Sequence, residues 1–232
     1  MIYVVSDLHG YPLKEFKRLL AKADFGDDDF CFVLGDVIDR GNDGINLLCW
    51  LMEQSNFELI LGNHEAMLLS CAFLFETVTE ETISGLTGTK LQMYSAWISN
   101  GGQPTADALS ALSTDEREYL LEYLSDAPLY DTVTAGEKDF ILTHSGLGSF
   151  DKNKKLSDYS RHDLIWNRPN LNVRYFDDIM TVFGHTPTVY YGNEYKGRAI
   201  ITDTWANIDA GAACGYKPML LRLDDMKEFY LD

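Results

Sequence analysis

Paired cysteines, long hydrophobic runs and an excess of positive charge are all absent from this chain of 232 residues. No apolar stretch approaches the roughly 18 residues that a membrane-spanning helix needs, and no basic, apolar leader opens the sequence. The cysteines include no Cys-x-x-Cys pair, which argues against a zinc ribbon and against a disulfide framework. These cysteines are Cys31, Cys49, Cys71 and Cys214. We therefore expect a cytoplasmic protein whose thiols are reduced and mostly buried.

The charge balance limits the possible partners. Lysine and arginine number 19 against 36 aspartates and glutamates, which gives a formal net charge of −17. Nucleic acids and anionic membrane surfaces attract basic proteins, so neither is an expected partner. A phosphorylated substrate remains compatible if metal ions and arginines reverse the field locally. The length and a hydrophobic fraction of 46% fit one large α/β domain.

The first third of the chain alternates strand and helix patterns. Short apolar runs predict three buried strands, at 2–6, 30–34 and 57–61. A helix with Pro12 at its start follows the first run, a helix that Asp43 can cap follows the second, and another begins near Glu65. This order predicts a mostly parallel sheet with helices on both faces.

Residues 76–128 interrupt the alternation. Within them, Ser113 and Glu116 form a capping-box pattern, apolar and aromatic residues at 119, 120, 123 and 124 share one helical face, and Pro128 lies beyond. Because no flexible linker flanks the segment, we expect a helical insertion on a single domain that spans 1–232. Later strands are predicted at 139–143, 179–184, 198–202 and 218–223.

Residues of the kinds that bind metals follow five of these strands. The early strands end in SDLHG, GDVIDRG and GNHE, and two late strands end in THSG and FGHT. Four of the five histidines fall in these clusters, namely His9, His64, His144 and His185. Either of the last two alone would more often be a satisfied core histidine. Ligands of open α/β sheets bind beyond the carboxyl ends of strands, so the clusters are expected to meet at one rim.

Taken one at a time, these clusters differ in how strongly they indicate a metal site. Asp7 and His9 lie two residues apart and point the same way on an extended segment, as two ligands of one ion must, but Asp-x-His alone is more often a turn. Asp36 is the stronger signal, because GDVIDRG crowds two glycines, two aspartates and an arginine into seven residues. The alternative there is a turn held by a surface pair of Asp39 and Arg40.

Together, in this order and over most of the chain, DLHG, GDVIDRG, GNHE, HSG and GHT resemble the motifs of the phosphoprotein phosphatase family of binuclear metallophosphoesterases. Within that family the chain is similar to short bacterial and phage members of the lambda-phosphatase type and to symmetrical diadenosine tetraphosphatases. The motif set runs from Asp7 to Arg168 and His185, and NIDAGAACG at 207–215 resembles the family's final strand. One such match is weak, whereas five in order are specific.

The resemblance implies a calcineurin-like four-layer sandwich, in which two mixed sheets lie between helices, with two divalent ions at its centre. The first ion would be bound by Asp7, His9 and Asp36. The second would be bound by Asp36, Asn63, His144 and His185. Asp36 would bridge the two ions. Oxygen and imidazole ligands without thiolate suit manganese, which we expect most, and also iron or zinc.

The resemblance also implies roles for four further side chains. His64 would be the general acid, Asp39 would orient it, and Arg40 and Arg168 would bind the phosphate. A hydroxide bridging the two ions would attack phosphorus in line, and His64 would protonate the leaving oxygen. Arg168 rests on the shorter match LIWNRP, and its alternative is a surface arginine before a proline.

Three functions are compatible with these residues. The first is a serine/threonine protein phosphatase, acting on a phosphorylated protein or a phosphorylated small molecule. The second is a hydrolase that splits diadenosine tetraphosphate symmetrically. The third, an inactive metal-binding scaffold, predicts a lost ligand or acid, and none is lost. Ser6 and Ser145 stand where the family usually has glycine and alanine, which bears on substrate detail more than on activity.

Overall fold

The computed structural model describes residues 1–75 and 79–232, with residue 81 described by its backbone alone. Its strands are β1 (Ile2–Val5), β2 (Phe30–Val33), β3 (Phe57–Leu59), β4 (Tyr130–Ala135), β5 (Lys138–Thr143), β6 (Ile179–Phe183), β7 (Ile200–Ile201), β8 (Trp205–Asn207), β9 (Met219–Arg222) and β10 (Lys227–Tyr230). Its α-helices are α1 (Leu13–Lys22), α2 (Gly44–Met52), α3 (Asn63–Ser70), α4 (Glu80–Ser84), α5 (Gly88–Trp97), α6 (Gln103–Ala111), α7 (Thr114–Asp126) and α8 (Arg161–Ile165).

The strands form two five-stranded mixed sheets. The first has the order β10-β9-β1-β2-β3, and the second has the order β4-β5-β6-β8-β7. Strands β1, β2 and β3 are parallel, with Val5 opposite Val33, and so are β5, β6 and β8. Parallel neighbours bring their carboxyl ends to one edge, which is what places the polar clusters near one another.

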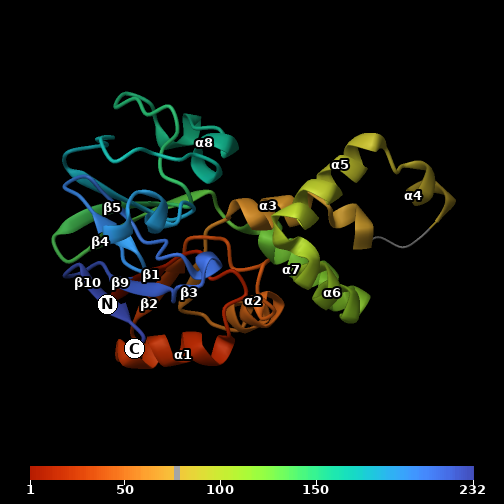
Figure 1. The fold of residues 1–232 in the computed structure, drawn as a ribbon, viewed down its shortest axis with the longest axis horizontal. Coiled ribbons are helices and arrows are strands. Elements are labelled where there is room, and N and C mark those ends of the chain that lie inside the picture. Colours follow the sequence, from red (N-terminus) through yellow and green to blue (C-terminus); the bar gives the residue numbers. More distant parts are fainter. Residues whose placement is uncertain (76–78) are drawn as a thin grey trace.

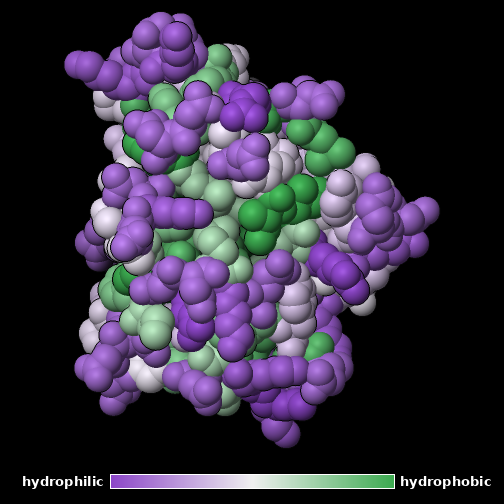
Figure 2. All heavy atoms as spheres, turned by 90° about the vertical axis from the view of Figure 1, so that its left-hand side faces the viewer, coloured by the Kyte–Doolittle hydropathy of each residue, from purple (hydrophilic) through white to green (hydrophobic). Residues whose placement is uncertain are grey.

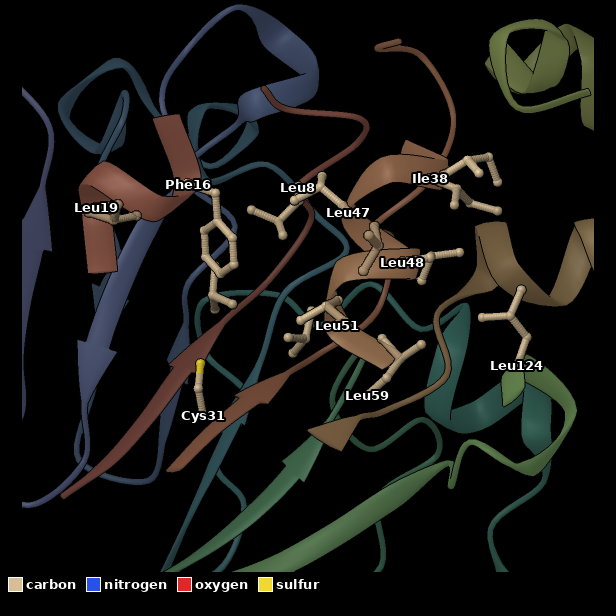
Figure 3. Close-up of a cluster of buried hydrophobic side chains, with 14 of the residues drawn as sticks. Leu8, Phe16, Leu19, Cys31, Ile38, Leu47, Leu48, Leu51, Leu59 and Leu124 are labelled. Atoms are coloured by element: carbon tan, nitrogen blue, oxygen red, sulfur yellow. The ribbon is translucent and has the colours of Figure 1, made fainter. Parts of the chain in front are cut away.

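Alternation along the strands builds the layers. In β1, Tyr3 and Val5 face helices, while Val4 packs into the core shared with the second sheet, as a period of two requires. Figure 3 shows the helix-facing core, where Phe16 of α1 and Leu48 of α2 lie over the first sheet. A third core covers the outer face of the second sheet with the segment around α8. The four-layer sandwich expected from the resemblance is confirmed. The alternation of strands and helices predicted one sheet with helices on both faces, and this was wrong: helices cover one face of each sheet, and the other face packs against the second sheet.

Helices α4 to α7 extend to one side of the sandwich (Figure 1). They fall inside the predicted insertion, of which residues 76–78 lie outside the described part. The capping box of α7 is present, with the Glu116 amide donating to Ser113 Oγ at 3.3 Å. Leu120 and Leu124 are buried as predicted, but Tyr119 is 65% exposed, so the buried face is narrower than the sequence suggested.

Several local predictions were wrong. Asp43 precedes α2 but does not cap it; its carboxylate accepts the Leu13 amide of α1 at 2.9 Å. The strand expected at 198–202 is the two-residue β7, and β4, β8 and β10 were not predicted. Cys49 and Cys214 are exposed, although the other two cysteines are buried and all four are free.

The surface away from the helical extension is covered mostly by hydrophilic side chains, with a hydrophobic group near its middle and other hydrophobic side chains scattered over it (Figure 2). Among the helices of the described residues, none combines the length and apolar character that crossing a bilayer requires.

Candidate metal centre

The carboxyl ends of β1, β2, β3, β5 and β6 meet at one rim, and the predicted site residues lie there. Turns with left-handed backbone aim the side chains inward: φ is 53° at Asp7, 43° at His9, 55° at Asp36 and 68° at His185. This region costs a non-glycine residue of the order of 1 kcal/mol or more, so it persists only where surrounding contacts fix it. Four such residues at one rim indicate a functional site.

The first group of potential ligands centres on His9. Its Nε2 lies 3.8 Å from Asp7 Oδ1 and 3.6 Å from Asp36 Oδ2. Its Nδ1 lies 3.2 Å from the Ile38 carbonyl oxygen, to which the protonated nitrogen can donate. That hydrogen bond leaves the Nε2 lone pair directed at the carboxylates, as metal-binding histidines require.

The second group centres on His144, which is fully buried. Its Nδ1 lies 2.7 Å from the Leu34 carbonyl oxygen, and its Nε2 faces three other atoms. Asn63 Oδ1 is 2.9 Å away, His185 Nδ1 is 3.2 Å away and Asp36 Oδ1 is 3.4 Å away. Asp36 therefore contributes one oxygen to each group, the geometry expected of a bridging carboxylate.

These residues fit divalent cations. The histidines His144 and His185 direct ring nitrogens at each other, and such lone pairs repel unless a proton or a cation lies between them. Asp7 Oδ1 is buried and has no hydrogen-bond partner among the described residues. An unpaired buried carboxylate oxygen is costly, and a cation would satisfy it.

Burial and mutual attraction shift the titration of these groups in opposite directions. Burial raises the pKa of Asp7 to about 6 and lowers that of His9 to about 3. Burial, together with the nearby His144, lowers the pKa of His185 to about 2. For His144, burial is outweighed by the charge of Asp36, which raises its pKa to about 10. A cation entering this group must displace the proton on His144.

His64 lies beside both groups, at the start of α3. Its Nδ1 is 2.6 Å from Asp39 Oδ2, and its Nε2 is 3.1 Å from Arg40 Nη2. Burial lowers its pKa, but the charges of Asp36 and Asp39 outweigh this effect and the net shift is upward. Distance alone would also allow His64 to join His9 and Asp36 around one ion. The partner of the ring nitrogen Nδ1 nevertheless distinguishes His64 from the two histidines. A carboxylate contacts Nδ1 of His64, whereas backbone carbonyls contact Nδ1 of His9 and His144.

The two arginines lie at the mouth of the rim, and both are exposed. Arg40 Nη1 is 3.2 Å from His9 Nε2. Arg168 is close enough for its charge to help lower the pKa of His185. Its segment is tied to the site because the Asn167 amide donates to Ser145 Oγ at 2.9 Å. The serine that departs from the family pattern therefore holds the backbone beside Arg168.

Two sets of supporting residues had no predicted role. Glu65 is fully buried, and its carboxylate accepts the amides of Asp36 and Val37 at 2.8 Å each and that of Gly62 at 3.1 Å. It thus ties the turn after β2 to the turn after β3. Asp209, also buried, has its pKa raised by burial and by Asp7, and accepts the Gly211 amide at 2.9 Å. Both lie inside recognised motifs, GNHE and NIDAG, which was the available signal.

The second set comes from the helical extension. Trp97 Nε1 donates to Asp39 Oδ2 at 2.9 Å, and the Asp39 amide donates to Thr105 Oγ1 at 3.0 Å. The Arg40 amide donates to the Gly101 carbonyl at 2.8 Å. No sequence signal separated these residues from an ordinary helix core.

With fold and site in place, the chain can be compared with known proteins. Residues 1–210 match the Calcineurin-like phosphoesterase family, and the chain belongs to that family. It is a metallophosphoesterase, a hydrolase whose family implies divalent metal ions, and the predicted fold and motif resemblance are confirmed.

Its relatives divide between two named activities. Serine/threonine-protein phosphatase 2 of Salmonella typhimurium is 28% identical over 92% of this chain and 88% of its own length. A symmetrical bis(5'-nucleosyl)-tetraphosphatase of Buchnera aphidicola is 41% identical, but over only 30% of this chain and 26% of its own length. A solved structure whose assignment as a diadenosine tetraphosphatase is itself provisional aligns with a TM-score of 0.66 and 16% identity, over 98% of this chain and 90% of its own. At that identity the structural likeness shows the fold alone.

Proposed function

We propose that this metallophosphoesterase is a two-metal phosphomonoesterase whose main substrates are phosphoserine and phosphothreonine in proteins. The observation that carries the proposal is the pair of potential ligand groups, around His9 and around His144, that share Asp36, with the hydrogen bond between His64 and Asp39 beside them. Similarity over nearly the full length of a serine/threonine-protein phosphatase supports this substrate class.

In this proposal each side chain acts as its surroundings suggest. Asp7, His9 and Asp36 bind one ion. Asp36, Asn63, His144 and His185 bind the other. When bound, such ions supply hydroxide near neutral pH and neutralise developing charge; manganese is our first choice, with iron or zinc as alternatives.

The remaining side chains handle the substrate. Arg40 and Arg168, both exposed at the mouth of the rim, hold the phosphate oxygens, and Arg40 exchanges its contacts with His9 and His64 for the phosphate. Once Arg40 has left its Nε2, His64 carries a proton there, which it gives to the leaving oxygen as the phosphorus–oxygen bond breaks. Asp39 keeps the opposite nitrogen, Nδ1, in its protonated form.

One feature favours the second candidate, symmetrical hydrolysis of diadenosine tetraphosphate. A pocket of about 490 Å³ lies between α3, α5 and α8, lined by Met67, Met93, Trp166 and Arg161 among others. Trp166 is 36% exposed, and its ring centroid is 6.0 Å from that of His185. An indole face beside the metal centre could stack a nucleobase. Tyr159 and Tyr175, two other aromatic residues of the segment 147–178, are buried.

A side-by-side assay decides between the two. Turnover with added Mn²⁺ would be compared on a phosphoserine peptide, p-nitrophenyl phosphate and diadenosine tetraphosphate. The proposal expects kcat/KM to be highest on the peptide. A large preference for diadenosine tetraphosphate, lost in Trp166→Ala, would instead establish the second candidate.

A further inference from the structure

Asp39, like Glu65, is buried with no exposed surface, and among the described residues all the hydrogen bonds of its side chain converge on one oxygen. Oδ2 accepts from His64 Nδ1 at 2.6 Å and from Trp97 Nε1 at 2.9 Å. Oδ1 is buried without a hydrogen-bond partner among the described residues. Trp97 is thus the one side chain, besides His64 itself, that the described structure shows fixing the direction of this carboxylate.

The backbone beneath Asp39 is also held from the helical extension. Asp39 and Arg40 have φ values of 70° and 67°, a left-handed conformation that two successive non-glycine residues rarely adopt. Thr105 Oγ1 accepts the amide of the first, and the Gly101 carbonyl accepts the amide of the second. These two hydrogen bonds stabilise a turn that would otherwise be strained.

The turn between α5 and α6 is shaped to fit this loop. Gly101 has φ of 102°, and a Cβ there would lie 2.7 Å from Arg40 Cγ. A Cβ on Gly102 would lie 2.5 Å from Trp97 Nε1. Glycines at both positions let the helix pair approach Asp39 closely enough for the indole to donate.

We infer that Trp97 is a positioning residue for proton donation: its indole N–H orients the Asp39 carboxylate, which in turn holds His64 with Nε2 directed at the leaving oxygen. The inference rests on the proposed function for its catalytic meaning. It assigns to the helical extension a task in the reaction itself, beyond packing. Among the described residues the Trp97 indole donates to Asp39 and not to a proposed ligand, so its loss should leave ion binding unchanged.

The need of the leaving group for a proton determines which reactions the loss of Trp97 should slow. As the phosphorus–oxygen bond breaks, the departing serine alkoxide requires the proton of His64 Nε2, whereas p-nitrophenolate is stable without it. A misdirected His64 therefore slows the peptide reaction much more than the aryl phosphate reaction. A general loss of structure would slow both equally.

The test compares Trp97→Phe with Trp205→Phe, a matched control. Trp205 is also buried, and its Nε1 donates at 3.0 Å to the Val173 carbonyl oxygen rather than to Asp39. For Trp97→Phe we expect kcat on a phosphoserine peptide to fall about tenfold or more, as part of the 10²- to 10⁴-fold that general acids contribute. On p-nitrophenyl phosphate we expect less than about a threefold fall, with KM nearly unchanged for both. Trp205→Phe should leave the ratio of the two rates as in the wild type.

A second measurement does not depend on turnover. The short hydrogen bond between His64 Nδ1 and Asp39 should give a downfield proton resonance in protein loaded with diamagnetic Zn²⁺, assigned by its loss in His64→Asn. We expect this resonance to shift or broaden in Trp97→Phe and to persist in Trp205→Phe. Thr105→Val should resemble Trp97→Phe, and Thr105→Ser should restore the wild-type spectrum.

The outcomes separate this inference from the proposed function. An unchanged resonance in Trp97→Phe, or equal losses on both substrates, overturns the role of Trp97. If the wild type hydrolyses neither phosphomonoester, the proposed function fails, and the resonance alone then decides whether Trp97 orients the pair.

Discussion

The proposed metal ligands and the proposed proton donor are held by different parts of the molecule. The proposed ligands stand on turns at the ends of strands from both sheets, fixed by backbone carbonyls of the core such as those of Leu34 and Ile38. His64 shares that rim, but its partner Asp39 is held by Trp97 and Thr105 of the helical extension. If the proposed roles hold, the two sheets by themselves place the metal ligands, whereas the orientation of the general acid depends on the helical extension.

The largest effect is expected from replacing Asp36, the proposed ligand that the two groups share. Asp36→Asn should lower both ions' affinity and reduce kcat by at least about 10³-fold, because its carboxylate contacts both ligand groups and its charge is lost. Metal analysis after dialysis, alongside kcat, would check this. Retention of two tightly bound ions would contradict a bridging role.

Replacing the acid should separate catalysis from ion binding. His64→Asn is expected to reduce kcat on a phosphoserine peptide by about 10² to 10⁴-fold while metal content stays at the wild-type level. The His64 ring is placed by Asp39 and by its own position on α3, so its loss leaves the other ligand contacts intact. If the dialysed variant is metal-free, His64 is a ligand and the role assigned here is wrong.

Replacing Asn63, the neighbour of His64 in the sequence, should affect ion binding directly. Asn63→Ala removes the amide oxygen 2.9 Å from His144 Nε2 and should weaken one ion by about 10- to 100-fold while sparing the other. Calorimetric titration with Mn²⁺ would then show two unequal sites. Equal weakening of both, or of neither, would argue against Asn63 as a ligand of one ion.

The smallest expected effect concerns the substrate side of the rim. Ser145→Ala removes the hydroxyl that accepts the Asn167 amide and loosens the segment that carries Arg168. One hydrogen bond contributes about 0.5–1.5 kcal/mol, so KM should rise about two- to tenfold with kcat nearly constant. A fall in kcat with constant KM would place Ser145 in the chemistry instead.

Much of the fold and the rim could be predicted because the relevant signals are local. Strands β1 and β2 are short apolar runs, and each is followed within three residues by an aspartate, Asp7 or Asp36. By contrast, the three-residue β8 was not predicted, and β7 has only two of the five residues of the apolar run that predicted it. The structure brings the six proposed ligands, which the family resemblance named, to one rim, and their individual roles remain predictions.

The residues that sequence reasoning missed share a different property. Trp97 on α5 looks like any buried tryptophan, and its importance arises from one atom that contacts Asp39, 58 residues earlier in the chain. Asp43 looked like a cap of its own helix, yet it caps α1 from a distance of 30 residues. Partners so far apart in sequence are set by tertiary packing, which no local pattern encodes.

Glu65 has one more consequence. By gathering the peptide N–H groups of two separate turns onto a single carboxylate, it locks both turns together using nothing but the protein's own atoms. We therefore expect the proposed ligands to keep their arrangement in the folded chain before any ion binds. Metal ions should then be removable from the site and able to bind again without unfolding of the surrounding sheets.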